Sequence, residues 1–181
     1  MAQGNFIVWL DLETTGLDPR TGIIIEIGMV ITDYQLTQEY GSYHAIVQTE
    51  DADWEGVPAK VIEMHKSSGL GQRSYDSTTT LEQAEQGAIA SMRQWFSSVK
   101  PPMGGRNPGF DRGFIQVHMP QLYGMFHHHL VDVCTLEEVI RMRKLEVPPF
   151  TPAWEHTAIA DVRDSIEQTK LYLEHLGLVK S

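Results

Sequence analysis

The sequence contains a single cysteine and no long apolar run. Cys134 cannot form an internal disulfide, which agrees with a reducing compartment. No apolar stretch approaches the roughly 18 residues that a membrane-spanning helix needs, and the N-terminal residues lack the basic and apolar regions of a signal peptide. The sequence therefore predicts a cytoplasmic protein with no membrane contact.

Basic residues are also scarce. The 14 Lys and Arg residues face 24 Asp and Glu residues, which gives a formal net charge of −10. The overall field of such a protein repels nucleic acid and offers no broad basic face to it. Any nucleic-acid substrate would have to be held locally, for instance through bound metal ions.

The chain has no internal repeat, low-complexity tract or long linker rich in Pro, Gly or Ser. Its 181 residues, of which 41% are hydrophobic, suffice for one domain with a substantial core and are few for two. We therefore expect one domain that covers residues 1–181.

Apolar and β-branched residues predict three consecutive strands near the N-terminus, and their short links suggest an antiparallel meander. The predicted strands cover residues 5–13, 22–33 and 40–49. Later patterns predict helices over 57–68, 80–99, 111–118 and 135–144, a short strand over 101–105 parallel to the first, and an extended segment over 127–133. This order of elements is typical of an α/β fold.

The clearest helix is the last one. Its apolar face repeats from Ala158 to Leu176, with Thr157 as the expected N-cap and Gly177 as the expected residue after the C-cap. Thr80 is the expected N-cap of the helix over 80–99. Methionine and aromatic residues of the predicted elements, such as Met92, Trp95 and Phe114, are expected in the core or in contacts between helices.

The segment "LDLETTGLDP" ends the first strand on two acids. Asp11 and Glu13 are two residues apart, so both carboxylates point to the same side of the strand. Two negative charges at such a short separation destabilise each other unless a cation lies between them. The pair by itself also fits a strand end with solvated acids.

Two further acids occupy similar positions. Asp111 follows the turn "GGRNPGF" into a helix, and Asp161 opens the last helix, five residues after His156. Singly, Asp111 could be an N-cap and Asp161 a solvated acid of the first turn. Together with Asp11 and Glu13 they lie where α/β folds build their sites, and four oxygen donors favour Mg²⁺ or Mn²⁺ over structural zinc.

Such a set of acids suggests a reaction at phosphorus. In-line displacement uses two divalent ions about 3.5 to 4 Å apart, one to activate water and one to stabilise the leaving oxygen. An imidazole titrates near neutral pH, so His156 could accept the proton of that water, although a single histidine is also commonly structural. Glu26, on the second predicted strand, could orient the metal ligands or serve as a sheet acid with its own partner.

Several motifs occur in an order and spacing that resemble one enzyme family. They are "WLDLETTGLDP", "IIIEIG", "HKSSGL", "FDRGF", "MPQLYGMFH", "VDVCTL" and "HTAIADVRDS". Together they resemble the oligoribonucleases, in the DEDDh branch of 3′→5′ exonucleases, from about Phe6 to His175. The combination of D-x-E, a later D and H-x4-D is highly specific, whereas each part alone is not.

The resemblance implies an RNase H-like fold, with a mixed five-stranded sheet flanked by helices. It implies that Asp11, Glu13, Asp111 and Asp161 organise two Mg²⁺ or Mn²⁺ ions, with His156 as general base. The implied reaction releases 5′-mononucleotides from the 3′ end of short single-stranded RNA, and the implied assembly is a homodimer. It also implies that Thr14 and Thr15 receive the terminal 3′-hydroxyl and that Leu17 packs on the terminal bases.

The chain departs from the family pattern where substrate length is determined. Lys60 stands where oligoribonucleases have a base-stacking tryptophan, although His65 of the same segment is retained and Trp54 could compensate. His128 and His129 stand where the family draws an aromatic residue and an arginine from the second subunit to hold a 5′-phosphate. Asn107, four residues before Asp111, resembles polymerase-proofreading exonucleases instead.

Other interpretations therefore stay open at this point. The enzyme could trim longer single-stranded DNA or RNA, or the chain could be a nucleic-acid-binding module without catalysis. The latter is disfavoured because the four acids and His156 are all present. The run His127 to His129 could be a surface metal site or an exposed strand at a dimer edge.

Overall fold

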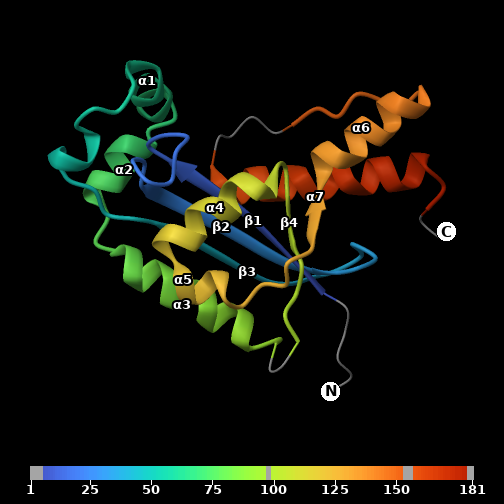
Figure 1. The fold of residues 1–181 in the computed structure, drawn as a ribbon, viewed down its shortest axis with the longest axis horizontal. Helices are drawn as coiled ribbons and strands as arrows, with labels where there is room; N and C mark the ends of the chain where they lie inside the picture. The colour runs from blue at the N-terminus through green and yellow to red at the C-terminus, as the bar shows by residue number, and fades with distance from the viewer. Residues whose placement is uncertain (1–5, 97–98, 153–156, 179–181) are drawn as a thin grey trace.

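A computed structural model of the chain describes residues 6–96, 99–152 and 157–178. Five strands form one sheet in the order β3-β2-β1-β4-β5, as Figure 1 shows. The strands are β1 (Phe6–Thr14), β2 (Ile24–Asp33), β3 (Glu39–Ile46), β4 (Met103–Gly105) and β5 (Leu130–Asp132). Because β1, β2 and β3 pair antiparallel while β4 and β5 run parallel to β1, the predicted meander and mixed sheet are confirmed.

The helices are grouped on the two faces of this sheet. They are α1 (Ala59–Ser67), α2 (Leu70–Asp76), α3 (Leu81–Arg93), α4 (Pro108–His118), α5 (Pro120–Tyr123), α6 (Val133–Arg143) and α7 (Ala158–His175), and a 3₁₀ turn spans Asp51–Trp54. In Figure 1, α3, α4 and α5 cover one face and α7 crosses the other. None of the helices in the described part of the chain is long and apolar enough to cross a membrane.

The alternation of β1 determines what each face receives. Val8, Leu10 and Leu12 join the core beneath α3 and α4. Ile7 and Trp9 point the other way and pack with Val162 and Ile166 of α7, and with Val30 of the neighbouring strand. Because side chains alternate along a strand, Asp11 and Glu13 continue the face that α7 covers.

Two of the expected helix ends are confirmed. Thr80 accepts a hydrogen bond from the backbone N–H of Gln83 at 3.2 Å, and the Gln83 side chain accepts one from the Thr80 backbone, which forms a capping box. Gly177 follows the last helix with φ at +67°, a backbone conformation that glycine adopts without strain. Thr157 is the N-cap residue of α7, but its side chain makes no capping hydrogen bond.

The expected helix over 80–99 was too long, and α2 was missed. α3 ends at Arg93, and Trp95 lies beyond it in a turn, where its ring contacts Tyr40 and Phe6. Trp95 is 39% exposed and therefore lies outside the buried core. α2 begins directly after Gly69, which ends the previous helix with φ at +71°, and its seven residues carry no capping signal of their own.

Candidate active site

Asp11 and Glu13 lie near the C-terminal end of β1, on the face covered by α7. Asp161 lies in the first turn of α7, which begins next to this end of the strand. One carboxylate oxygen from each of these three residues lies within 4.8 Å of those from the other two. The structure therefore brings together three of the four acids that the sequence singled out.

The fourth acid, Asp111, contacts the same strand in a different way. Its Oδ1 accepts a hydrogen bond from the backbone N–H of Leu12, between the two acids of β1, at 3.1 Å. Asp111 is buried inside the first part of α4, so its interpretation as an N-cap was wrong. The cap position belongs to Asn107, which ends the preceding turn in the left-handed conformation with φ at +57°.

Burial and mutual repulsion dominate the electrostatics of these acids. Burial, with the charges of Asp111, Glu13 and Asp161, holds the pKa of Asp11 well above its usual range. Burial, then Asp161, Glu26 and Asp111, raises the pKa of Glu13 to about 8. Burial also raises the pKa of Asp111 to about 7, although the hydrogen bond from Leu12 opposes the shift.

This set of donors fits divalent metal ions. The carboxylates converge, all are oxygen donors, and the neighbouring charges that act on Glu13 are negative. A hard cation between them would remove the repulsion that raises their pKa values. We conclude that the geometry fits a divalent cation, in keeping with the metal expected from the sequence.

The metal-free protein is expected to lose stability as the pH rises from about 5 to about 8. The pKa of Glu13 rises on folding from 4.5 to about 8, and that of Asp111 from 3.8 to about 7, so the folded state binds more protons in this window. The expected loss is several kcal/mol, since one pKa unit corresponds to about 1.4 kcal/mol and both groups shift. Thermal unfolding in a chelator at several pH values measures it.

Added Mn²⁺ is expected to remove this loss, because the cation stabilises the ionised carboxylates. The Glu13→Gln variant, which cannot ionise at this position, should show a shallower dependence on pH in chelator than the wild type. Burial lowers the pKa of His65, so this residue makes the folded state more stable as the pH rises. The comparison with Glu13→Gln separates the contribution of Glu13 from that of His65. Equal melting temperatures at both ends of the window, for wild type in chelator, would contradict the account.

The residues expected to receive the 3′ end are Thr14, the last residue of β1, and Thr15 and Leu17 in the turn that follows. The Thr14 hydroxyl donates to the backbone carbonyl of Gly16 at 2.8 Å, and the Thr15 hydroxyl accepts from the backbone N–H of Ile23 at 3.0 Å. The Thr15 backbone N–H donates to the Ile23 carbonyl. Leu17, at the tip of the turn, is 85% exposed, so this apolar side chain is free to pack on a ligand.

His65 reaches this turn from α1. It is buried, and its Nε2 lies 2.9 Å from the backbone carbonyl of Thr14, one residue after Glu13. His65 therefore holds the backbone next to the acids in place. Trp54 packs edge-on against the His65 ring at 6.0 Å and stacks with Tyr75, beside a cavity of about 320 Å³.

Asn107, His128 and His129 lie in the segments next to β4 and β5. The Asn107 side chain is exposed, and its backbone N–H donates to Asp132 at 3.1 Å. His128 and His129 precede β5, a strand parallel to β1. They therefore lie at the N-terminal end of the parallel strands, whereas the acids lie at the C-terminal end of β1.

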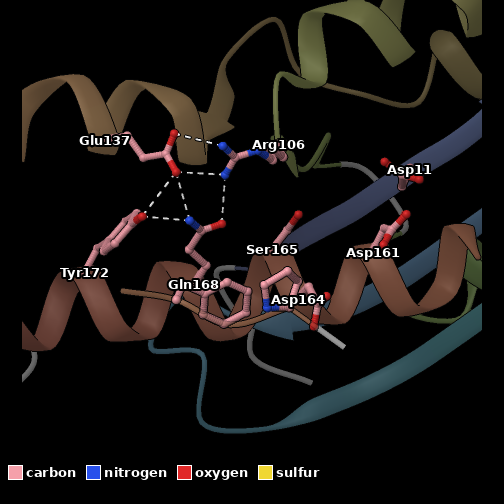
Figure 2. A pocket seen from close by; sticks show the side chains of 10 residues that line it. Asp11, Arg106, Glu137, Asp161, Asp164, Ser165, Gln168 and Tyr172 are labelled. Carbon is pink, nitrogen blue, oxygen red and sulfur yellow. Dashed lines mark hydrogen bonds and ion pairs between the residues drawn. The ribbon is translucent and has the colours of Figure 1, made fainter. Parts of the chain in front are cut away.

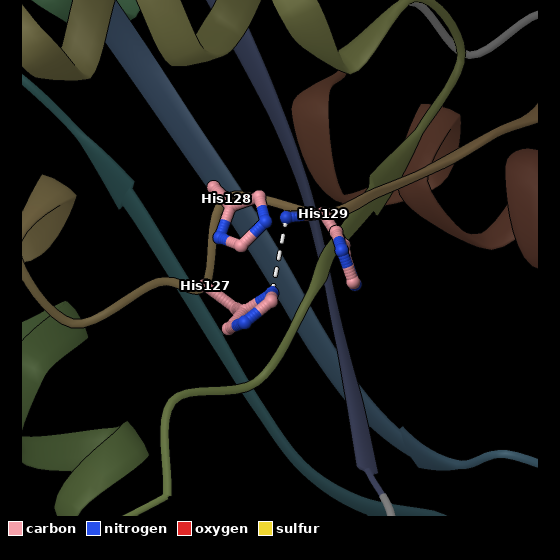
Figure 3. Close-up of side chains that lie close together, drawn as sticks. All are labelled: His127, His128 and His129. Atoms are coloured by element: carbon pink, nitrogen blue, oxygen red, sulfur yellow. Dashed lines mark hydrogen bonds between the residues drawn. The ribbon is translucent and has the colours of Figure 1, made fainter.

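Figure 3 shows the rings of His127, His128 and His129 close together, with centroids 4.1 to 4.4 Å apart. The His129 backbone N–H donates to Nδ1 of His127 at 3.1 Å. In a neutral ring this acceptor role leaves the proton on Nε2, so His127 would have to give up this bond to bind a metal through Nε2. One ring nitrogen from each of the three histidines lies within 4.8 Å of the others, so the trio could hold a metal ion once His127 gave up this bond.

His156 lies outside the described residues. The chain is described again from Thr157, which immediately precedes α7. The expectation that His156 is the general base therefore stays a prediction from the sequence.

A polar network next to the acids was missed by sequence reasoning. Figure 2 shows a cavity of about 590 Å³ that extends from Asp11 and Asp161 to Arg106, Glu137, Gln168 and Tyr172. Arg106 donates two hydrogen bonds to Glu137, at 2.8 and 3.0 Å, and one to Gln168 at 3.0 Å. Gln168 donates to Glu137 and to the Tyr172 hydroxyl, so the network is closed.

A signal for part of this network was present in the sequence. Asp161, Ser165, Gln168 and Tyr172 recur at helical spacing and line the same cavity. This polar stripe on the last helix starts at a candidate metal ligand, which distinguishes it from an ordinary solvated face. Arg106 and Glu137 carry no comparable signal.

Comparison with known proteins identifies close sequence relatives. A family model described as "Exonuclease" (RNase_T) matches residues 8–169. Oligoribonuclease from Colwellia psychrerythraea strain 34H is 38% identical, over 93% of this chain and 93% of the relative. Oligoribonuclease from Escherichia coli K12 is 35% identical, over 96% of this chain and 97% of the relative.

Solved structures share the fold at low sequence identity. E. coli exonuclease I in complex with a 5cy-dT13 oligonucleotide superimposes with a TM-score of 0.72 at 17% identity, over 98% of this chain and 42% of that one. The nuclease domain of 3'hExo, a DEDDh family member bound to rAMP, gives 0.63 at 13% identity, over 99% of this chain and 96% of that one. The chain spans about two fifths of the exonuclease I chain, and the expected RNase H-like fold is confirmed.

Proposed function

Because the chain belongs to the oligoribonuclease family of exonucleases, we propose that it hydrolyses short single-stranded RNA from the 3′ end and releases 5′-mononucleotides. The observation that carries this proposal is the convergence of Asp11, Glu13 and Asp161 at one end of β1. Relatives that match more than nine tenths of the chain are named oligoribonucleases, which supports the choice of RNA.

We propose that the carboxylates of Asp11, Glu13, Asp111 and Asp161 organise two Mg²⁺ or Mn²⁺ ions. When bound, such ions supply positive charge for in-line displacement at phosphorus. The raised pKa of Glu13 supports this role, because the pocket places negative charges together without neutralising them. Asp111 also fixes the strand backbone between the acids through its bond to Leu12.

The remaining roles are assigned to residues around the acids. His156 accepts the proton of the attacking water, as its neutral imidazole permits near pH 7. The backbone at Thr14 and Thr15 receives the 3′-hydroxyl, held in place by His65, and the exposed Leu17 packs on the terminal base. We assign the Asn107 side chain, exposed beyond β4, to contact with the substrate strand.

The 5′ side of the substrate is assigned to a second copy of the chain. His128 and His129 precede β5, at the opposite end of the parallel strands from the acids, and we assign their contact with a bound oligonucleotide to a partner subunit. We therefore propose a homodimer, in the cytoplasm, in which these histidines face the 5′ end. A neutral imidazole holds a phosphate less firmly than arginine does.

A second candidate function is the trimming of longer single-stranded DNA or RNA. Lys60 in place of the family tryptophan and the position of Asn107 favour it. The net charge of −10 opposes it, because a long strand needs a positively charged groove along its backbone. We therefore prefer the short substrate.

A comparison of substrate lengths tests this preference. With Mn²⁺, a 5′-labelled RNA dinucleotide is expected to be cleaved about tenfold faster than an RNA of twenty nucleotides, because the longer strand brings more phosphates near the acidic surface. Matched DNA and the Asp161→Ala variant serve as controls. Stepwise degradation of the 20-mer while the dinucleotide persists would favour the second candidate, and intact RNA of every length would refute both.

A further inference from the structure

Glu26 is a buried acid of β2 with a partner on each carboxylate oxygen. It pairs with Glu13 across the two strands. Its Oε1 lies 2.7 Å from Nε2 of His44 on β3, and its Oε2 accepts a hydrogen bond from the backbone N–H of Ala158 at 3.0 Å. Glu26 therefore links the sheet to a residue 132 positions away in the sequence.

The bond to Ala158 caps α7 from outside the helix. Ala158 is the first residue of α7, and the first backbone N–H groups of a helix have no partner within it. Thr157 occupies the N-cap position but contributes no side-chain hydrogen bond. A carboxylate is also favoured at this end of a helix, where the macrodipole is positive. Glu26 thus serves as the cap that the local sequence does not provide.

Gly28, two residues after Glu26 on β2, determines sterically how close the start of α7 can lie to the strand. It lies opposite Asp11 on β1 and opposite His44 on β3. A Cβ at Gly28 would lie 2.5 Å from the carbonyl carbon of Ala158 and 2.5 Å from the nitrogen of Ile159. Only glycine lets the start of α7 lie this close to the strand. Gly28 thus leaves room for the start of α7, and Glu26 holds it there through a hydrogen bond.

This position determines where Asp161 lies. Asp161 is three residues after Ala158, in the same first turn, and its carboxylate is one of the three that converge within 4.8 Å. We propose that Glu26 is a positioning residue, which holds the start of α7 so that Asp161 completes the carboxylate site, with His44 orienting the Glu26 carboxylate. The inference rests on the proposed function, because it concerns the same metal site.

The test compares three variants with wild-type protein. Glu26→Met fills a similar volume without an acceptor, Glu26→Gln keeps an acceptor for the Ala158 N–H, and Gly28→Ala pushes against the start of α7. Glu85→Ala is the matched control, because Glu85 is also buried and also accepts backbone N–H bonds, from Gln121 and Leu122 on the other face of the sheet. Both glutamates are therefore caps, but only Glu26 lies next to the acids.

Two measurements made without RNA are decisive. Calorimetry of Mn²⁺ binding is expected to show affinity about 10- to 100-fold weaker in Glu26→Met and Gly28→Ala, and within a few-fold of wild type in Glu26→Gln. Amide hydrogen exchange at Ala158 should be slow in the wild type and fast in Glu26→Met. Glu85→Ala should lower the melting temperature without changing Mn²⁺ affinity. Glu26→Met would give this same pattern if the role of Glu26 were purely structural.

Wild-type Mn²⁺ affinity in Glu26→Met, or a protected Ala158 amide in that variant, would overturn the inference. If Glu26→Met does not fold, Gly28→Ala decides, since it displaces α7 while retaining the glutamate. Failure of the proposed function would appear in the RNA cleavage assay, where wild-type protein would bind Mn²⁺ but leave RNA intact. That result would not change what the calorimetry says about Glu26.

Discussion

Replacing Asp11 with alanine is expected to lower the rate of RNA hydrolysis about 10³-fold or more, because the variant loses charge at the point where the transition state needs bound cations. Asp11 is central in this respect, since its carboxylate converges with those of Glu13 and Asp161. The measurement is the release of mononucleotides from a short labelled RNA at saturating Mn²⁺.

The control for this variant removes an acid elsewhere. Glu138 is exposed on α6 and pairs with Arg141 on the same helix, so Glu138→Ala should retain wild-type turnover. The Asp11→Ala protein should also stay folded and lose part of the pH-dependent instability, because one of the repelling charges is gone. Near-normal turnover in Asp11→Ala would mean that the converging carboxylates are not the reaction site.

Replacing His156 with alanine is expected to reduce the rate about 10²- to 10⁴-fold, the usual contribution of a general base. Mn²⁺ binding should survive, because the carboxylates supply the ligands. The rate of the variant should rise with pH, since hydroxide can replace the missing base. The measurement is a profile of rate against pH for both proteins, with Mn²⁺ binding followed separately by calorimetry.

His175→Ala is a matched control, because this histidine lies at the far end of α7, where its ring contacts the Leu171 carbonyl. It should behave like the wild type at every pH. An unchanged rate in His156→Ala would remove the histidine from the mechanism. A loss of Mn²⁺ binding in the same variant would instead make it a metal ligand.

The fold and the carboxylate pair could be predicted because their signals are local. The alternation of β1 places Asp11 and Glu13 on one face, and the 3.6-residue repeat of the last helix places Asp161 in its first turn. Their convergence needed only the expectation that strand ends and helix starts meet in an α/β fold. The separation of their ligand oxygens, within 4.8 Å, agrees with it.

Features that depend on distant parts of the chain could not be predicted. Asp111 was expected among the four acids, but its hydrogen bond from the Leu12 backbone, 99 positions away, was not. Glu26 and Ala158 are separated by 132 positions, and His65 and Thr14 by 51. No periodicity connects such pairs, so only the three-dimensional packing reveals that these polar side chains hold the backbone around the acids.

The network of Arg106, Glu137, Gln168 and Tyr172 was also missed, although Gln168 and Tyr172 recur with Asp161 at helical spacing. Its members come from the end of β4, from α6 and from α7, and each alone resembles an ordinary surface or helix residue. In the structure they form one wall of the cavity whose other end holds Asp11 and Asp161. The chain thus adds a fixed guanidinium to a site that is otherwise acidic.

The most direct test of the central claim is a gel time course with a 5′-labelled RNA of about five nucleotides, comparing wild-type protein and Asp161→Ala in Mn²⁺. The account predicts that labelled RNA shortens one nucleotide at a time from the 3′ end and finally yields a labelled 5′-mononucleotide, while the variant leaves it intact. Release of the labelled nucleotide before shorter intermediates appear, or normal shortening by Asp161→Ala, would contradict it.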